Sequence, residues 1–209
     1  SPFTALGVFM GIKASLKWQT GSESLAGKKV AVQGVGHVGY HLVQQLVEDG
    51  AQAIVCDIDH DNLKKVTDSF QGVEVVAPDD IYGVDCDIFA PNALGAVIND
   101  QTIPQFKCSI IAGSSNNVLA VEEIHAPALK ERGILYAPDY VINAGGLINV
   151  ANELEGYNRD RATNQVSGIY DIVMDIFRIA ETEGITTQKA ANTLAERRIV
   201  AMGRIKHTF

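Results

Sequence analysis

The chain has 209 residues, of which 46% are hydrophobic and 20% charged, a balance that supports a buried core and argues against extended disorder. Acidic residues outnumber basic ones by 25 to 17, and the lysines and arginines are scattered, so the sequence has no electrostatic footprint for nucleic acid or anionic lipid. Three separated cysteines without a CxxC pair argue against a disulfide framework or a zinc site, and no apolar run approaches the ~18 residues that span a bilayer.

These properties predict one soluble, cytoplasmic domain over residues 1–209, with small-molecule partners and no bound metal. The chain begins with an expected helix over residues 1–18, followed by a polar linker at 19–24. Short runs rich in Val and Ile then predict buried parallel strands at 29–34, 53–57, 73–77, 86–90, 108–113 and 134–138.

Segments with helical periodicity separate several of these strands, for example 37–50 and 121–133, and both end in glycine. Three more helices are expected at 146–155, 160–182 and 187–203. Alternating strands and helices predict an α/β fold of the Rossmann type, with a doubly wound, mostly parallel sheet and flanking N- and C-terminal helices.

The segment VAVQGVGHVG carries the first chemical motif. Gly34, Gly36 and Gly39 form GxGxxG directly after a strand and at the start of a helix. Each position there needs a residue without a side chain, for a tight turn, for close approach to a pyrophosphate or for helix–strand packing. Asp57 ends the next strand, where a carboxylate can accept both hydroxyls of an adenine ribose and would repel the 2'-phosphate of NADP. The motif therefore predicts NAD as the cofactor.

The neighbours of this motif are further candidates for cofactor contact: His37, Val38 and Ile58. Asp59 is a second candidate for the ribose hydroxyls. The alternative is that the glycines only shape a turn and Asp57 only caps a strand.

Two polar loops follow the fourth and fifth predicted strands. They are PNALG, residues 91–95, and AGSSNN, residues 112–117. Both should open at the carboxyl edge of the sheet, beside the glycine loop, where uncharged donors and acceptors suit a carboxamide or a ribose. Ordinary turns are the alternative interpretation. The candidate cofactor residues in and next to these loops are Ala90, Asn92, Ala93, Asn116 and Asn117.

The stretch APDYVINAGGLINVANE, residues 137–153, passes from a strand-like segment through two adjacent glycines into an apolar helical pattern. Gly145 and Gly146 indicate that the backbone there passes something closely or adopts dihedral angles closed to other residues. The residues alone do not identify that neighbour.

Taken together, GVGHVG with Asp57, AGSSNN, PDYVINAGGLINVANE and GYNR (156–159) resemble the Glu/Leu/Phe/Val dehydrogenase superfamily, and most closely its leucine-specific members. The likeness covers essentially the whole chain, which corresponds to the C-terminal part of those enzymes. The resemblance implies that a preceding domain, absent from this chain, carries the catalytic lysines and aspartate. No lysine here lies in a glycine-rich context, so no catalytic residue is assigned.

The resemblance also implies roles for individual residues. The turn with Asn143 should face the cleft between domains, near the reacting centre. Thr4 should lie near the nicotinamide carboxamide, although it could be a simple first-turn residue, and Asn116 and Asn117 should lie near the nicotinamide ribose.

Two apolar residues, Leu147 and Val150, match positions that line the substrate side-chain pocket in the family. A buried carboxylate substrate without a polar partner there would cost several kcal/mol, so apolar amino acids are favoured. Ordinary core packing is the alternative for both residues.

The resemblance implies that the intact enzyme, an expected homo-oligomer, oxidises L-leucine and related branched-chain amino acids to 2-oxo acids and ammonia, with hydride transfer to NAD. Phenylalanine or valine dehydrogenase, or a free-standing NAD-binding regulatory module, are the alternatives. This chain alone should bind NAD without turnover.

Histidines add no further site to this prediction. His37 and His41 have i, i+4 spacing but lack the glutamate of HExxH. His125, with Glu122 and Glu123, is expected at the surface.

Overall fold

A computed structural model describes residues 2–154 and 156–206, and it contains a parallel sheet with the strand order β3-β2-β1-β4-β5-β6. The sheet winds one way from β1 to β3 and the other way from β4 to β6, so the topology reverses between β1 and β4. Crevices at such a reversal, at the carboxyl ends of the strands, are where α/β sheets bind ligands. The strands are β1 Lys29–Gln33, β2 Gln52–Cys56, β3 Glu74–Val75, β4 Ile88–Pro91, β5 Ile110–Ile111 and β6 Leu135–Tyr136.

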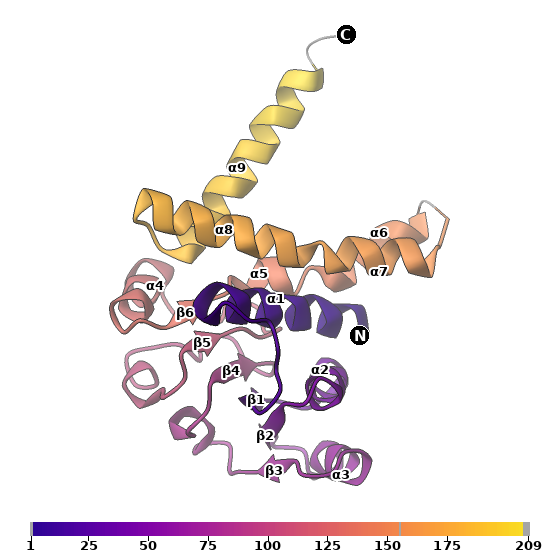
Figure 1. Cartoon of the computed structure of the whole chain (residues 1–209), viewed down its shortest axis with the longest axis vertical. Coiled ribbons are helices and arrows are strands. Elements are labelled where there is room, and N and C mark those ends of the chain that lie inside the picture. Colours follow the sequence, from indigo (N-terminus) through magenta and orange to yellow (C-terminus); the bar gives the residue numbers. More distant parts are fainter. Residues whose placement is uncertain (1, 155, 207–209) are drawn as a thin grey trace.

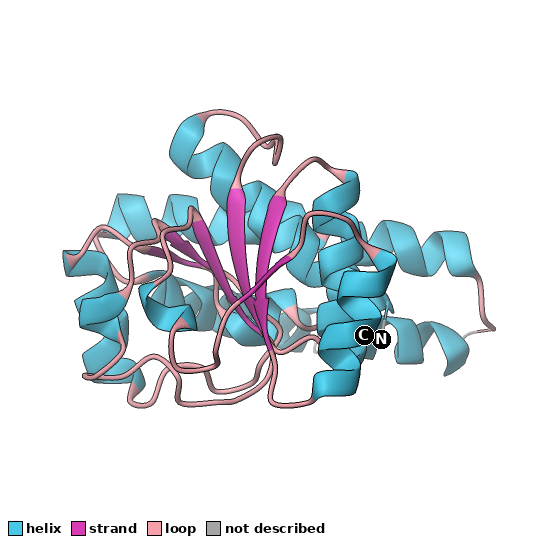
Figure 2. Cartoon of the chain, turned by 90° about the horizontal axis from the view of Figure 1, so that it is seen from below, coloured by secondary structure: helices cyan, strands magenta, loops and turns pink. Residues whose placement is uncertain are grey.

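Helices cover both faces of the sheet (Figure 2). They are α1 Pro2–Thr20, α2 His37–Glu48, α3 His60–Ser69, α4 Glu122–Glu131, α5 Asp139–Ile142, α6 Gly145–Leu154, α7 Arg159–Ser167, α8 Ile169–Glu183 and α9 Thr187–Lys206, with short 3-10 turns at Ile81–Gly83 and Ile103–Gln105. The paired helices α6 and α7 extend to one side of the body, and α9 projects away from it (Figure 1). No helix within the described ranges is both long enough and apolar enough to cross a bilayer.

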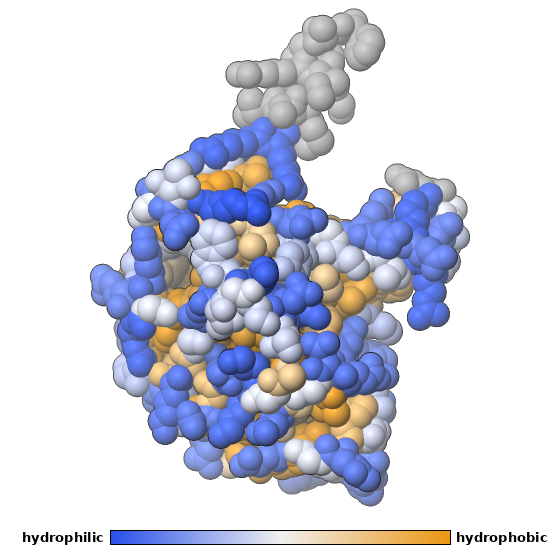
Figure 3. Space-filling view, in the orientation of Figure 1, coloured by the Kyte–Doolittle hydropathy of each residue, from blue (hydrophilic) through white to orange (hydrophobic). Residues whose placement is uncertain are grey.

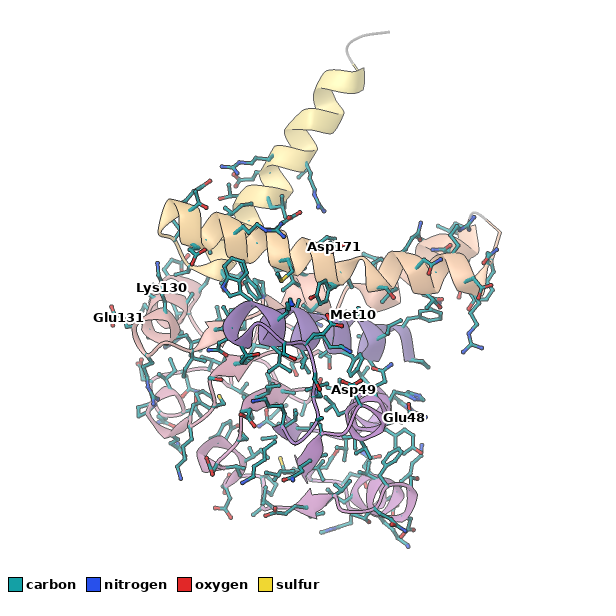
Figure 4. All side chains as sticks on the ribbon, in the orientation of Figure 1. Met10, Glu48, Asp49, Lys130, Glu131 and Asp171 are labelled. Carbon is teal, nitrogen blue, oxygen red and sulfur yellow. The ribbon has the colours of Figure 1, made fainter. Side chains whose placement is uncertain are left out.

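The N-terminal helix α1 is held between the sheet layer and the C-terminal helices. It packs against α8 and α2, and the rings of Trp18 and Phe177 lie 5.8 Å apart between their centroids. At its flank, Lys13 Nζ lies 3.7 Å from Asp49 Oδ2, and Figure 4 shows Asp49 on this side of the molecule. A second core lies on the opposite face of the sheet, where the rings of Phe89 and Phe106 are 5.0 Å apart.

This architecture confirms the predicted Rossmann-type fold, while four local predictions need correction. The first concerns residues 73–77, which do not form a buried strand. Only Glu74 and Val75 pair, and both are exposed because β3 is an edge strand with one neighbour. Branched residues favour exposed and buried strands alike, so the composition alone could not distinguish them.

The second correction concerns the helix expected at 160–182, which is two helices separated by Gly168. The ψ angle of this glycine is −13°, less negative than the value of about −42° in an α-helix, so the regular helical backbone is interrupted for one residue. Residues 1 and 155, which fall in other expected helices, lie outside the described residues.

The third correction concerns the strand-like segment before the double glycine, which is the helical turn α5. Val141 and Ile142 favour a strand by composition. In the structure Ile142 is fully buried against α1, because Gly7 and Gly11 leave space for it: a Cβ on Gly11 would lie 2.5 Å from Ile142 Cγ2. Tertiary packing therefore overrides the local preference.

The fourth correction concerns His125, which is buried, with 4% of its surface exposed. Its Nδ1 accepts a hydrogen bond from the Val121 N–H at 2.9 Å, and its Nε2 lies 3.2 Å from Asp100 Oδ1. Val121 is the N-cap residue of α4 and has no capping side chain of its own, so the histidine satisfies its N–H group instead. The role is structural.

Candidate functional site

The three glycines of the first motif have three different environments. Gly34 has a φ of +89°, and a Cβ there would lie 2.6 Å from the Ala93 Cβ of the loop after β4. A Cβ on Gly39 would lie 2.0 Å from the Gly34 carbonyl oxygen, so helix α2 and the loop could not pack. At Gly36 the nearest atom would be 4.0 Å away. The backbone at Gly36 is therefore open to a ligand, while Gly34 and Gly39 are required by packing.

Helix α2 presents its N-terminus at this opening. Gly36 is the N-cap residue, and no side chain caps the helix. His37 is exposed and Val38 is half-buried beside it. The first N–H groups of a helix and its dipole favour an anion, so the end of α2 suits a pyrophosphate.

Asp57 lies directly after β2, half-buried and held by the glycine loop. Its Oδ2 accepts hydrogen bonds from the Val35 N–H at 2.8 Å and from Asn62 Nδ2 at 3.4 Å, and its Oδ1 accepts from the Asp59 N–H at 2.9 Å. Since a carboxylate offers about four lone-pair directions and three donors already occupy it, capacity for a ribose hydroxyl remains. Asp59 instead caps α3 by accepting from the Asp61 N–H at 2.8 Å. Asp57 is thus the better ribose candidate.

Two residues next to Asp57 differ sharply in exposure. Ile58 is 88% exposed, so an apolar side chain stands open to solvent at the mouth of the site. Cys56 is buried, and burial raises the pKa of its thiol to about 11, partly offset by a hydrogen bond with the Gly34 backbone. Cys56 therefore stays protonated beneath the glycine loop at neutral pH.

Asn92 links the loops that follow β1, β4 and β5. Its N–H donates to the Gln33 carbonyl at 2.7 Å, its Nδ2 donates to the Ala90 carbonyl at 3.0 Å, and its Oδ1 accepts from the Ser114 N–H at 2.9 Å. The predicted loop residues are therefore brought together along one edge, as the parallel topology requires.

The same network extends to the residues after β6. Asn143 Nδ2 donates to Asn116 Oδ1 at 2.6 Å and lies 3.4 Å from the Ser114 carbonyl oxygen. Asn117 has a φ of +52°, which asparagine tolerates better than most residues, and its carbonyl accepts from the Ala96 N–H at 2.7 Å. Four strand ends thus contribute to one continuous polar rim.

The double glycine at 145–146 is explained by α1. A Cβ on Gly145 would lie 2.0 Å from the Phe3 carbonyl oxygen, and one on Gly146 would lie 2.7 Å from Thr4 Oγ1. The close neighbour within this chain is therefore the first turn of α1. Thr4 is half-buried there, at the turn that begins with Asn143.

The two candidate pocket residues are not in the core. Leu147 is 74% exposed and Val150 is 51% exposed, so the core alternative for them is wrong. Leu154 is 87% exposed and continues their helical spacing, which gives α6 an apolar outward stripe. Figure 3 shows apolar surface below the arm formed by α6 and α7.

A polar network missed by sequence reasoning holds this arm together. Asn152 on α6 is only 2% exposed and hydrogen-bonds to Gln165 and Arg161 of α7. Arg161 Nη2 also donates to the Gly156 carbonyl at 2.9 Å. A polar residue within an apolar helical pattern was the available signal, because buried amides need partners.

The residues at the carboxyl edge fit a dinucleotide. The open backbone at Gly36, the uncapped end of α2 and the Asp57 carboxylate match a pyrophosphate and a ribose. Ser115 Oγ is buried without a hydrogen-bond partner among the described residues, so the rim has a spare polar atom. Within residues 2–154 and 156–206, no group of three or more His, Cys, Asp or Glu could hold a metal.

Comparisons with known proteins agree with this geometry. The profile of the glutamate/leucine/phenylalanine/valine dehydrogenases matches residues 55–205. A leucine dehydrogenase of Thermoactinomyces intermedius is 55% identical over the whole chain, which spans 57% of that protein. A phenylalanine dehydrogenase of Bacillus thermotolerans is 46% identical over 99% of the chain and 55% of its own length. The crystal structure of an L-tryptophan dehydrogenase from Nostoc punctiforme superposes with a TM-score of 0.92 at 51% identity, covering 96% of this chain and 60% of that one.

Proposed function

We propose, because this chain belongs to the glutamate/leucine/phenylalanine/valine dehydrogenase family, that it is the NAD-binding part of an amino-acid dehydrogenase. Members of this family use NAD or NADP. The observation that carries the choice of NAD is the Asp57 carboxylate, fixed by the Val35 N–H at the end of β2. A 2'-phosphate beside this carboxylate would meet a like charge, whereas ribose hydroxyls would donate to it.

Each part of the rim then has a distinct role in holding the cofactor. The N-terminus of α2 binds the pyrophosphate, and Ile58 and Val38 offer apolar contact to the adenosine half. Asn92, Asn116 and Asn143 lie at the other end of the network, where amide groups suit the nicotinamide half. When bound, the cofactor supplies the hydride acceptor, and the chain orients it.

We propose apolar amino acids as the substrates of the intact protein. Leu147 and Val150 project from α6 beside the turn at Asn143, and neither offers a partner to a charged substrate side chain. Leucine and related branched-chain amino acids fit two aliphatic walls best. Relatives named for phenylalanine and tryptophan show how close the aromatic alternatives are. The acid–base chemistry at the amino group is proposed to lie outside this chain, which spans little more than half of its relatives.

Calorimetric titration of the chain with NAD and with NADP tests the cofactor assignment. We expect measurable binding of NAD, much weaker binding of NADP, and a narrower gap in the Asp57→Ala variant. Asp59→Ala is the matched control, because Asp59 is the neighbouring carboxylate that caps α3 and should change stability more than cofactor preference. Equal affinity of the unmodified chain for both cofactors would refute the assignment.

A further inference from the structure

Cys86 and Cys108 lie side by side at the amino edge of the sheet. They precede β4 and β5, whose register pairs Ile88 with Ile110, so each cysteine is two residues before a paired position. Pairing continues up to the cysteines, because the Ser109 N–H donates to the Asp87 carbonyl at 3.0 Å. Adjacent strands are about 4.8 Å apart, within the Cα separation of about 4.4 to 6.8 Å that a disulfide spans. Both side chains belong to the second core cluster, so the two thiols lie on the same face of the sheet.

The two cysteines differ in access to solvent. Both pack in the second core cluster, but Cys86 is half-buried while Cys108 is 5% exposed. A small reagent can therefore reach Cys86 first. Cys56, the remaining cysteine, is 1% exposed on β2 and serves as an internal comparison.

The two thiols also differ in pKa, because each alters the pKa of the other. Donation from the Cys108 thiol lowers the pKa of Cys86, against the opposing effect of burial, and a hydrogen bond with the Ala31 backbone lowers it further. The pKa of Cys108 is raised by the same hydrogen bond and by burial. Cys86 is thus the nucleophile of the pair, since the thiolate is the reactive form.

We propose that Cys86 and Cys108 form a dithiol site that low-molecular-weight disulfides convert reversibly into an intramolecular disulfide. The Cys86 thiolate attacks one sulfur of the small disulfide, whose S–S bond breaks, and one small thiolate leaves and takes up a proton. Cys108 then loses its proton and attacks Cys86 Sγ, and the second small thiolate leaves. Two protein thiols are oxidised and one small disulfide is reduced to two thiols.

The second step is possible because the first removes one obstacle to it. Once Cys86 carries the small thiol, it no longer accepts the proton of Cys108, so only burial continues to hold the pKa of Cys108 high. The mixed disulfide should therefore be short-lived but detectable. The site lies at the edge opposite the candidate cofactor rim, and the inference does not rest on the proposed function.

The test uses the intact protein incubated with oxidised glutathione at neutral pH, followed by proteolysis under acid conditions and mass spectrometry. We expect a peptide pair joined through Cys86 and Cys108, lost after treatment with dithiothreitol. Cys108→Ser should stop at a glutathione adduct on Cys86, and Cys86→Ser should leave Cys108 unmodified. Cys56→Ser is the matched control and should behave like the unmodified protein.

Rates provide a second measurement that needs no variant. Cys86 should react with oxidised glutathione more than about tenfold faster than Cys56, because the pKa of Cys86 is lowered from its ordinary value whereas that of Cys56 is raised to about 11, and the larger thiolate fraction outweighs the lower nucleophilicity of that thiolate. A stable glutathione adduct without the joined peptides, reaction at Cys56 as fast as at Cys86, or no reaction at either cysteine of the pair would each overturn the proposal. Because the joined peptides are sought in the unmodified protein, the result does not depend on whether the serine variants fold.

Discussion

Gly145→Ala should destabilise the protein, because the added methyl group would meet the backbone of α1. The new Cβ would lie 2.0 Å from the Phe3 carbonyl oxygen and 2.8 Å from the Phe3 carbonyl carbon, whereas ordinary Cβ contacts are 3.4–4 Å. Backbone atoms cannot rotate away as a side chain can, so α1 or the turn must shift. Overpacking of this kind costs about 1–3 kcal/mol. At about 2–4 °C per kcal/mol for a chain of this size, Tm should fall by about 2–12 °C.

Scanning calorimetry with and without NAD would measure the effect. Gly83→Ala is the matched control, because Gly83 has no positive φ and a Cβ there would meet nothing within 4 Å. Its Tm should stay within about 2 °C of the unmodified chain, as expected for a surface change. NAD affinity should also fall in the Gly145 variant, since the shift moves Asn143. If the two alanine variants melt at the same temperature, the proposed contact between α1 and the double glycine is wrong.

Four other results are expected. Gly36→Ala should weaken NAD binding in a titration and lower Tm only slightly, through the poorer N-cap, whereas Gly39→Ala should lower Tm more; the opposite pattern would contradict the assigned glycine roles. In the intact enzyme, Val150→Ser should reduce kcat/KM for leucine about tenfold to hundredfold, and Leu147→Ala should favour phenylalanine over leucine; an unchanged ratio would exclude the pocket. This 209-residue chain mixed with leucine and NAD should form no NADH, measured by absorbance. Steady turnover would show that the acid–base residues lie within this chain after all. Finally, the thiol of Cys56 loses its proton near its ordinary pKa in the unfolded state but only near a pKa of 11 in the folded state. The free energy of unfolding should therefore fall by about 2 kcal/mol as the pH rises from about 9 to 11, and it should fall less in the Cys56→Ala variant. An equal pH dependence of the two proteins would refute the assigned shift.

The sequence could predict those parts of the site in which the local backbone conformation or packing allows only one type of residue. Gly34 needs a positive φ and Gly39 must leave room for a carbonyl oxygen, and both needs restrict the residue locally. Asp57 could be predicted as a ribose ligand because it directly follows a strand, and the carboxyl ends of parallel strands lie at one edge of the sheet. The parallel arrangement of the strands was enough to predict that the loops of Asn92 and Ser114 lie side by side, and the two residues are hydrogen-bonded.

The parts that could not be predicted depend on distant partners. The double glycine indicated a close neighbour, but only the folded chain shows that Phe3, more than a hundred residues earlier, fills that place. His125 is polar and follows two glutamates in its helix, yet it is buried because Val121 and Asp100 offer it partners. Local composition carries no record of such pairings, which arise from tertiary contacts.

The position of α1 has a consequence for how the chain reaches its native state. This helix precedes the sheet in the sequence, yet one of its two main packing partners is α8, which follows the entire sheet. Trp18, whose ring lies against that of Phe177, cannot be fully packed until the C-terminal helices are present. Closing a loop of this length is entropically costly and slow. The helix is therefore made before the sheet but is fully buried only after the C-terminal helices are present, and its apolar face needs shielding until then.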